Sequence, residues 1–218
     1  MQEDNIKLVW ITPNAEKLIA YMARVSNPAN QENHESGGKI IKYMVDHKHW
    51  SPFEMVDACF EITTTRDIAR QILRHRSFSF QEFSQRYQKV EQLPASQLRE
   101  ARLQDTKNRQ NSIVTDDELL TAEFNELQAI VVSITNGAYQ RALDMGIAKE
   151  VARSVLPEGL TTTRMYMKGS IRSWMHYCQV RMDESTQKEH RLIAQQISDV
   201  LTRELPVCWQ AVMGVVND

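Results

Sequence analysis

The stretch Arg66–Tyr87 reads RDIARQILRHRSFSFQEFSQRY and predicts a helix followed by a strand. In its first half, Ile68, Ile72 and Leu73 have the spacing of one apolar helix face. The following segment, Phe78–Val90, begins with several aromatic residues and is typical of a strand or an extended segment. The stretch therefore indicates a helix that packs on the core, with the chain returning beside it.

The same stretch is rich in arginine. Between its first residue and Arg86 there is no lysine, and the arginines are Arg66, Arg70, Arg74, Arg76 and Arg86. Arginine offers planar, permanently charged donors that suit phosphate and other anions. Gln71, Arg74 and His75 have the spacing of a second helix face, and the nearby phenylalanines suit a flat ring. We therefore expect this stretch to hold a polyanion.

Alternation along the expected strand sorts its side chains into two sets. One face would carry Gln81, Phe83 and Gln85, and the other would carry Glu82, Ser84 and Arg86. The second set combines an acceptor, a hydroxyl group and a cation. Ser84 lacks the GxSxG pattern of a hydrolytic nucleophile.

Composition predicts a globular intracellular protein. The chain has 218 residues, 42% of them hydrophobic, and a net charge of −2. Its three cysteines show no CxxC spacing, which favours a reducing compartment over a disulfide framework or a zinc cluster. With neither a signal peptide nor a long apolar run, we expect a cytoplasmic location, or the host-cell cytoplasm for a virus-encoded chain.

The rest of the chain mixes strand and helix patterns without repeats or linkers. We interpret it as one α/β (mixed α+β) domain over residues 1–218, with a variable excursion at about 91–115. Expected strands are Ile6–Thr12, Val56–Thr63 and Thr161–Met167. Expected helices are Asn14–Arg24, Lys39–Lys48, Asp116–Gly146, Ala148–Leu156, Ser170–Met182 and Thr186–Glu204.

Further cations lie late in the chain, namely Arg153, Arg172, His176 and Arg181. Each could be an ordinary surface residue.

A single-stranded nucleic-acid binder that clamps with arginine and stacks with phenylalanine is an alternative, but the net charge of −2 counts against it. No GxGxxG or GxxxxGK[ST] motif occurs, and His34, His47 and His49 lack acidic partners, so we expect no metal.

The chain resembles the flavin-dependent thymidylate synthases, the ThyX family. The signature is Arg74-His75-Arg76, seven further residues and then Ser84. Other blocks in family order are ARVSNP (23–28), HWSPFE (49–54), ARQILRHR (69–76), EVARSVLP (150–157) and IRSWMHYCQVR (171–181). Two further segments look most like those of virus-encoded members, namely FQEFSQRY (80–87) and KNRQNS (107–112).

The resemblance implies reductive methylation of dUMP to dTMP, with methylenetetrahydrofolate as carbon donor, FAD as redox cofactor and NADPH as reductant. It also implies a central, mostly antiparallel sheet flanked by helices, and a homotetramer with shared active sites, without membrane or nucleic-acid partners. A flavoenzyme that adds a different one-carbon group to dUMP remains an alternative, which the mass of the product would separate.

The resemblance also implies residue roles. The dUMP site would be formed by Gln71, Arg74, Glu82, Phe83, Ser84, Gln85, Arg86, Arg153 and Arg181. FAD would be contacted by Ser26, His49, Ser51, Arg74, His75, Arg76, Glu82, Ser170, Arg172 and His176. Arg181 would polarise the pyrimidine, and Ser84 would hold the substrate at the catalytic centre. Gln85, Ser170 and Ser185 depart from the residues common in the family.

Overall fold

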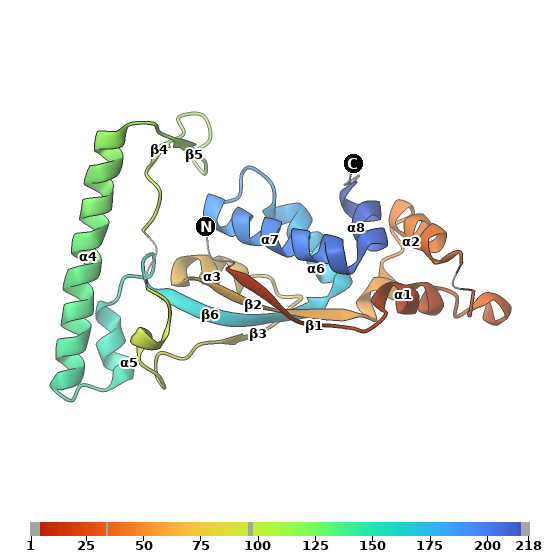
Figure 1. Cartoon of the computed structure of the whole chain (residues 1–218), viewed down its shortest axis with the longest axis horizontal. Helices are drawn as coiled ribbons and strands as arrows, with labels where there is room; N and C mark the ends of the chain where they lie inside the picture. Colours follow the sequence, from red (N-terminus) through yellow and green to blue (C-terminus); the bar gives the residue numbers. More distant parts are fainter. Residues whose placement is uncertain (1–4, 34, 96–97, 215–218) are drawn as a thin grey trace.

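A four-stranded antiparallel sheet runs through the middle of the molecule (Figure 1). The computed structural model describes residues 5–33, 35–95 and 98–214, so His34 lies outside the described residues. The strand order is β1 (Ile6–Ile11), β2 (Asp57–Thr65), β6 (Thr162–Ser170) and β3 (Ser79–Glu82). Every neighbouring pair is antiparallel, which confirms the expected sheet.

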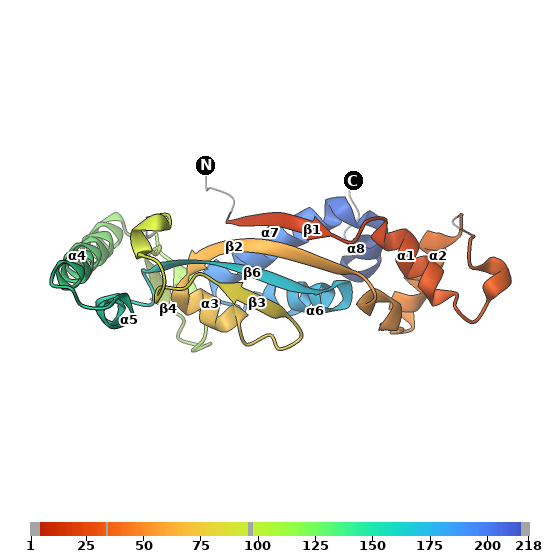
Figure 2. The same cartoon turned by 90° about the horizontal axis from the view of Figure 1, so that it is seen from below.

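Helices cover one face of this sheet. They are α3 (Arg66–Ile72), α6 (Ile171–Arg181), α7 (Lys188–Glu204) and α8 (Pro206–Met213), and Figures 1 and 2 show α6 and α7 on the same side of the strands. The inward residue Phe60 of β2 meets Trp174 of α6 edge to face, with ring centroids 4.9 Å apart. The Trp174 indole nitrogen donates a hydrogen bond to the Ala58 carbonyl at 3.2 Å, so its polar group is satisfied inside the core.

A glycine lets the Arg-His-Arg segment reach the sheet. The Phe78 ring lies directly on Gly169 of β6, where an added Cβ would come within 2.4 Å of a ring carbon. Phe78 also packs against Trp174, with centroids 4.6 Å apart. Since β3 begins at the next residue, this contact fixes where the chain turns from α3 into β3.

The remaining helices lie at the two ends of the sheet (Figures 1 and 2). At one end lie α1 (Ala15–Ala23), the 3-10 turn η1 (Pro28–Asn30), α2 (Gly37–Asp46) and the 3-10 turn η2 (Ser51–Glu54). At the other end lie α4 (Glu118–Asp144), α5 (Lys149–Ala152) and the 3-10 turn η4 (Arg153–Val155). The 27 residues of α4 include two buried side chains, Gln128 and Tyr139. Its apolar stripe, defined as Leu119, Leu127, Ile130, Val131 and Ile134, is exposed.

Two local expectations were wrong, and one helix was not foreseen. The extended segment after Phe78 stops as a strand at Glu82, and residues 85–87 form a turn, so alternation does not continue through Arg86. The helix expected to end at Glu204 does end there, but a further helix, α8, was not foreseen. Pro206 is its first residue, where the missing N–H costs nothing. The helix expected from Asn14 is not capped by the side chain of this residue, because Asn14 lies in the left-handed region and makes no cap hydrogen bond.

The excursion has structure of its own. It contains the 3-10 turn η3 (Val90–Gln92) and a hairpin of β4 (Arg102–Gln104) and β5 (Ser112–Val114). Arg102 of β4 pairs with Glu189 of α7 at 2.7 Å, and Arg99 pairs with Asp67 of α3 at 2.8 Å. These pairs tie the excursion to the two helices that flank the candidate site.

Cys59, Cys178 and Cys208 are free thiols, and all three are buried. Burial raises the pKa of each thiol, most strongly at Cys178 and Cys208. In the described part of the chain, no helix has the length and apolarity needed to cross a membrane. The same residues contain no His, Cys, Asp and Glu cluster placed to hold a metal ion.

Candidate active site

A cavity of about 700 Å³ opens at the end of β3. Five residues expected in the substrate site line it, namely Glu82, Phe83, Ser84, Gln85 and Arg153. The cavity is also lined by Arg66 and Arg70 of α3, and both pair with Glu158 at 3.3 Å. The structure therefore gathers residues from three separate segments around one cavity, which is lined by three arginines and three glutamates.

The turn after β3 separates Arg86 from the other residues expected in the substrate site. The Ser84 carbonyl accepts hydrogen bonds from the backbone N–H groups of Tyr87 and Gln88, both at 3.0 Å. Gln85 points inward and is 3% exposed, and its Nε2 has no hydrogen-bond partner among the described residues. Arg86 points instead into an adjoining cavity of about 780 Å³.

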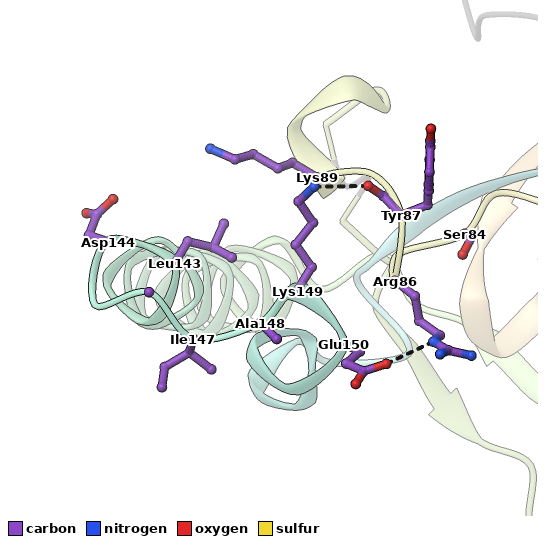
Figure 3. Close-up of a pocket in the computed structure, with 11 residues that line it drawn as sticks. Ser84, Arg86, Tyr87, Lys89, Leu143, Asp144, Ile147, Ala148, Lys149 and Glu150 are labelled. Atoms are coloured by element: carbon purple, nitrogen blue, oxygen red, sulfur yellow. Dashed lines mark hydrogen bonds and ion pairs between the residues drawn. The ribbon is translucent and has the colours of Figure 1, made fainter.

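Figure 3 shows this adjoining cavity between the turn and the α4–α5 junction. The Arg86 Nε donates to the Glu150 carboxylate at 3.0 Å, and Lys149 donates to the Tyr87 carbonyl at 3.0 Å. Ser84 and Glu150 line both cavities. Arg153 shares its cavity with Ser84 and donates from its Nε to the Glu150 carbonyl at 3.3 Å, so these three residues join the two hollows.

The carboxylate of Glu82 is already engaged. It accepts a hydrogen bond from the Thr163 hydroxyl at 2.9 Å and lies 3.7 Å from the Arg66 guanidinium. The Ser84 hydroxyl has no hydrogen-bond partner within the described part of the chain. A serine nucleophile needs an adjacent base. This geometry therefore favours a serine that binds a ligand over one that attacks it.

A second cluster forms where α3 and α6 end. The Arg181 Nε donates to Nε2 of His75 at 2.8 Å, so that this ring nitrogen is an acceptor. The His75 ring also meets Tyr177 edge to face, with centroids 4.9 Å apart. Burial, and then the charges of Arg181 and His176, lower the pKa of His75 to about 4. The imidazole is therefore neutral at pH 7. Burial is the largest cause of this lowered pKa.

The residues expected to contact flavin form a looser group. Ser26 and His49 are exposed near α1 and α2, and Ser51 opens η2. Ser170 caps α6 through the backbone N–H of Ser173. His176 is exposed on α6, and Arg172 of the same helix pairs with Glu54. Arg74 and Arg76 are exposed beside His75, and neither has an ion pair or a side-chain hydrogen bond among the described residues.

Comparison with known proteins identifies the family. Residues 7–207 match the family model of the thymidylate synthase complementing proteins, and curated relatives carry the name flavin-dependent thymidylate synthase. The chain belongs to this family.

The relatives align over most of their length. The flavin-dependent thymidylate synthase of Synechocystis is 54% identical over 191 residues, covering 88% of this chain and 86% of the relative. The probable flavin-dependent thymidylate synthase of Paramecium bursaria Chlorella virus 1 is 47% identical over 196 residues, covering 88% of each chain. The resemblance inferred from the sequence blocks is confirmed.

A solved structure agrees with the fold. It is the UMP/dUMP methylase PolB from Streptomyces cacaoi bound with 5-Br dUMP, with a TM-score of 0.79 and 27% identity. The match covers 96% of this chain and 94% of that chain. The mixed α/β architecture of this chain is therefore shared with a nucleotide methylase.

Sequence reasoning missed His190, which is fully buried on the first turn of α7. Its ring joins the Gln71 amide, at 3.2 Å, to the Tyr177 hydroxyl, at 3.0 Å. A signal was present in the sequence. His190 precedes Ile193, Ala194 and Ile197 at helical spacing, and a polar residue on such an apolar face needs a buried partner.

Acidification should destabilise the folded chain before most carboxylates titrate. Folding lowers the pKa of His75 to about 4 and that of His190 to about 3, in both cases mainly through burial. Unfolded histidine titrates near pH 6.5. Below about pH 6.5 the unfolded chain therefore binds more protons than the folded chain, and the free energy of unfolding falls as pH falls.

Urea unfolding at a series of pH values would measure this dependence. His190→Asn should show a flatter dependence between about pH 6.5 and about pH 4 than the wild-type chain, because one proton-binding site is removed. An equally steep dependence in the variant would contradict the assignment to His190.

Proposed function

We propose that the cavity at the end of β3 binds dUMP and that the cluster at the ends of α3 and α6 holds its pyrimidine against the flavin. As a flavin-dependent thymidylate synthase, the chain methylates dUMP to dTMP with FAD, NADPH and methylenetetrahydrofolate. The observation that carries the site assignment is the gathering of Glu82, Ser84, Gln85 and Arg153 around one cavity.

The nucleotide phosphate is assigned to Ser84, Arg86 and Arg153. A phosphate accepts several charge-assisted hydrogen bonds, and arginine supplies donors in a fixed planar fork. The Arg153 side chain donates from its Nε to a backbone carbonyl, and it makes no other ion pair or hydrogen bond among the described residues. The pairing of Arg86 with Glu150 is exposed on both sides, so it costs little to exchange this carboxylate for a phosphate.

The pyrimidine is assigned to Gln71, Arg74 and Arg181, with Glu82 and Phe83 beside the ribose and base. Uracil C5 must carry negative character to form a carbon–carbon bond. Donors aimed at the ring carbonyl stabilise that charge in a site that excludes water. The Arg181 guanidinium is held by neutral His75, which leaves its remaining N–H groups for the base.

The flavin is assigned to Ser26, His49, Ser51, Arg74, His75, Arg76, Glu82, Ser170, Arg172 and His176. Two exposed arginines without a partner in the described residues, Arg74 and Arg76, fit a pyrophosphate by charge and by donor geometry. When bound, FAD supplies the hydride chemistry that the protein side chains lack. The side chains provide binding, orientation and charge.

The active enzyme is proposed to be a homotetramer in which subunits share each active site. The exposed apolar stripe of α4 supports this assembly, because soluble monomers rarely expose so large an apolar surface. The loose grouping of the flavin residues supports it as well, since a neighbouring subunit would complete the enclosure. Three buried free thiols support a cytoplasmic location.

Arg153→Ala should raise the dUMP dissociation constant by roughly tenfold to a hundredfold, because a charge-assisted partner is worth about 1.5–3 kcal/mol. Arg86→Ala should have a smaller effect in the same direction, because Arg86 is already paired. Calorimetric titration of the FAD-loaded enzyme would measure both constants. Arg203→Ala, on the exposed end of α7, is the matched control. Unchanged affinity in both site variants would remove them from the dUMP site.

Ser84→Ala should keep measurable dTMP synthesis and lose mainly dUMP affinity. The reason is that the Ser84 hydroxyl has no base beside it, since Glu82 is held by Thr163 and Arg66. Single-turnover methylation at saturating dUMP, with mass spectrometry of the quenched protein, would test this. A wild-type adduct of protein and dUMP that disappears with all turnover in the variant would restore the nucleophile.

A further inference from the structure

We propose that His190 is a positioning residue that sets the orientation of the Gln71 side-chain amide in the substrate site. The inference rests on the assignment of Gln71 to dUMP binding. His190 belongs to α7 and Gln71 to α3, so the contact also fixes the spacing of these two helices at the site.

A chain of hydrogen bonds runs from the core to the surface through these two residues. The Tyr177 hydroxyl lies 3.0 Å from Nε2 of His190, whose Nδ1 lies 3.2 Å from the Gln71 Oε1. The Gln71 Nε2 lies 2.8 Å from the Gln187 Oε1. The Gln187 Nε2 lies 3.0 Å from the Glu189 carboxylate.

The carboxylate at the surface end determines the direction of the whole chain. Burial raises the pKa of Glu189, but hydrogen bonds led by that from Arg102 outweigh it, so the net pKa is lowered and the group is ionised at neutral pH. An ionised carboxylate accepts only. Gln187 must therefore donate to it with Nε2 and turn its own oxygen toward Gln71.

The same logic continues inward. Gln71 donates to that oxygen with its Nε2, and its Oε1 therefore faces His190. His190 must then carry its proton on Nδ1, because a neutral imidazole has one donor and one acceptor. Its Nε2 is left to accept from Tyr177, whose pKa burial raises so far that the hydroxyl keeps its proton.

The consequence is a defined donor in the substrate site. Each side-chain amide has two N–H groups, and Gln71 donates one of them to Gln187. The second is free for a carbonyl oxygen of the pyrimidine. A reversed amide would present an acceptor there instead. The buried Nδ1 proton of His190 prevents this reversal, since it cannot hydrogen-bond an NH₂ group.

Two substitutions at position 190 separate orientation from packing. In asparagine the side-chain nitrogen occupies the place of the histidine Nδ1, so His190→Asn keeps the donor to Gln71. In glutamine the amide reaches the place of Nε2, so His190→Gln keeps the contact with Tyr177 and loses the one with Gln71.

On the FAD-loaded enzyme, His190→Gln should raise the dUMP dissociation constant about fivefold to tenfold, whereas the dissociation constant of His190→Asn should stay within about twofold of wild type. Melting temperature and flavin stoichiometry report on folding.

Equal effects of the two substitutions on dUMP affinity would show that His190 acts only through packing, and would overturn the proposal. Wild-type affinity in His190→Gln would do the same. Gln71→Ala tests the premise separately. If it leaves dUMP affinity unchanged, Gln71 is not in the substrate site and both the premise and the inference fall. If Gln71→Ala weakens dUMP binding while His190→Gln and His190→Asn have equal effects, only the inference about His190 is wrong.

Neutron diffraction from crystals of the wild-type holoenzyme tests the same point without any variant. It should locate the His190 proton on Nδ1 and both amide protons of Gln71 on the nitrogen that faces Gln187. A proton on Nε2 of His190 would overturn the proposal.

Discussion

Replacing Leu127 and Ile134 together with glutamate should split the enzyme into monomers and reduce dTMP synthesis by at least about a hundredfold. Leu127 is 56% exposed and Ile134 is 65% exposed, and both belong to the exposed stripe of α4. In the proposed tetramer this stripe is covered by another subunit. Each carboxylate buried there without a partner would cost several kcal/mol, which is enough to dissociate the assembly.

Light scattering after gel filtration would give the mass of each variant, and absorbance would give bound flavin per chain. Asn136→Glu is the matched control, because it adds a charge at an exposed position about 200° around the helix from Ile134. This control should remain assembled and active. A double variant that keeps the wild-type mass, or a monomer that retains full activity, would contradict the shared-site assembly.

Arg181→Ala should lower kcat/KM for dUMP by about a hundredfold to a thousandfold, the range found when one donor to a developing negative charge is removed. The guanidinium is positioned by its hydrogen bond to His75, whose neutral ring is an acceptor at pH 7. Arg181→Lys should restore the charge but neither the planar fork nor this hydrogen bond, so we expect only partial recovery. Steady-state kinetics with saturating NADPH and methylenetetrahydrofolate would measure these values.

The division of the effect between kcat and KM shows what Arg181 does. A fall in kcat at saturating dUMP indicates charge stabilisation during the reaction, whereas a change in KM alone indicates simple binding. Arg191→Ala is the matched control, because Arg191 lies on α7 and hydrogen-bonds the Glu184 backbone. Activity in Arg181→Ala equal to that of this control would remove Arg181 from the catalytic centre.

Periodicity in the sequence predicted the sheet and its helices well where the pattern was strong. The strand at Ile6–Ile11 and the capped helix after Ser170 lie where expected, because alternation and an N-cap serine are local signals. The strand after Phe78 was overextended, because β3 pairs with β6 only as far as Glu82. That limit is set by a tertiary partner and leaves no mark in the local sequence.

The candidate site could be predicted only in part. Family blocks pointed to Ser84 and Arg153, and the structure brings these two residues to one cavity. His190 and the Arg66–Glu158 pair were not foreseen, because these contacts join residues far apart in the chain. Local periodicity predicts which face a side chain occupies but gives no information about its distant partner.

Because Cys178 and Cys208 are fully buried, the rate at which they are alkylated should report how often the folded protein opens. Cys178 and Cys208 are 0% exposed, and their raised pKa values keep them as unreactive thiols. A reagent such as iodoacetamide can reach them only when the helices over the sheet separate. The rate of alkylation therefore measures how often the open state forms under native conditions. If dUMP or flavin binds only the closed state, alkylation should slow as the fraction of ligand-bound protein rises.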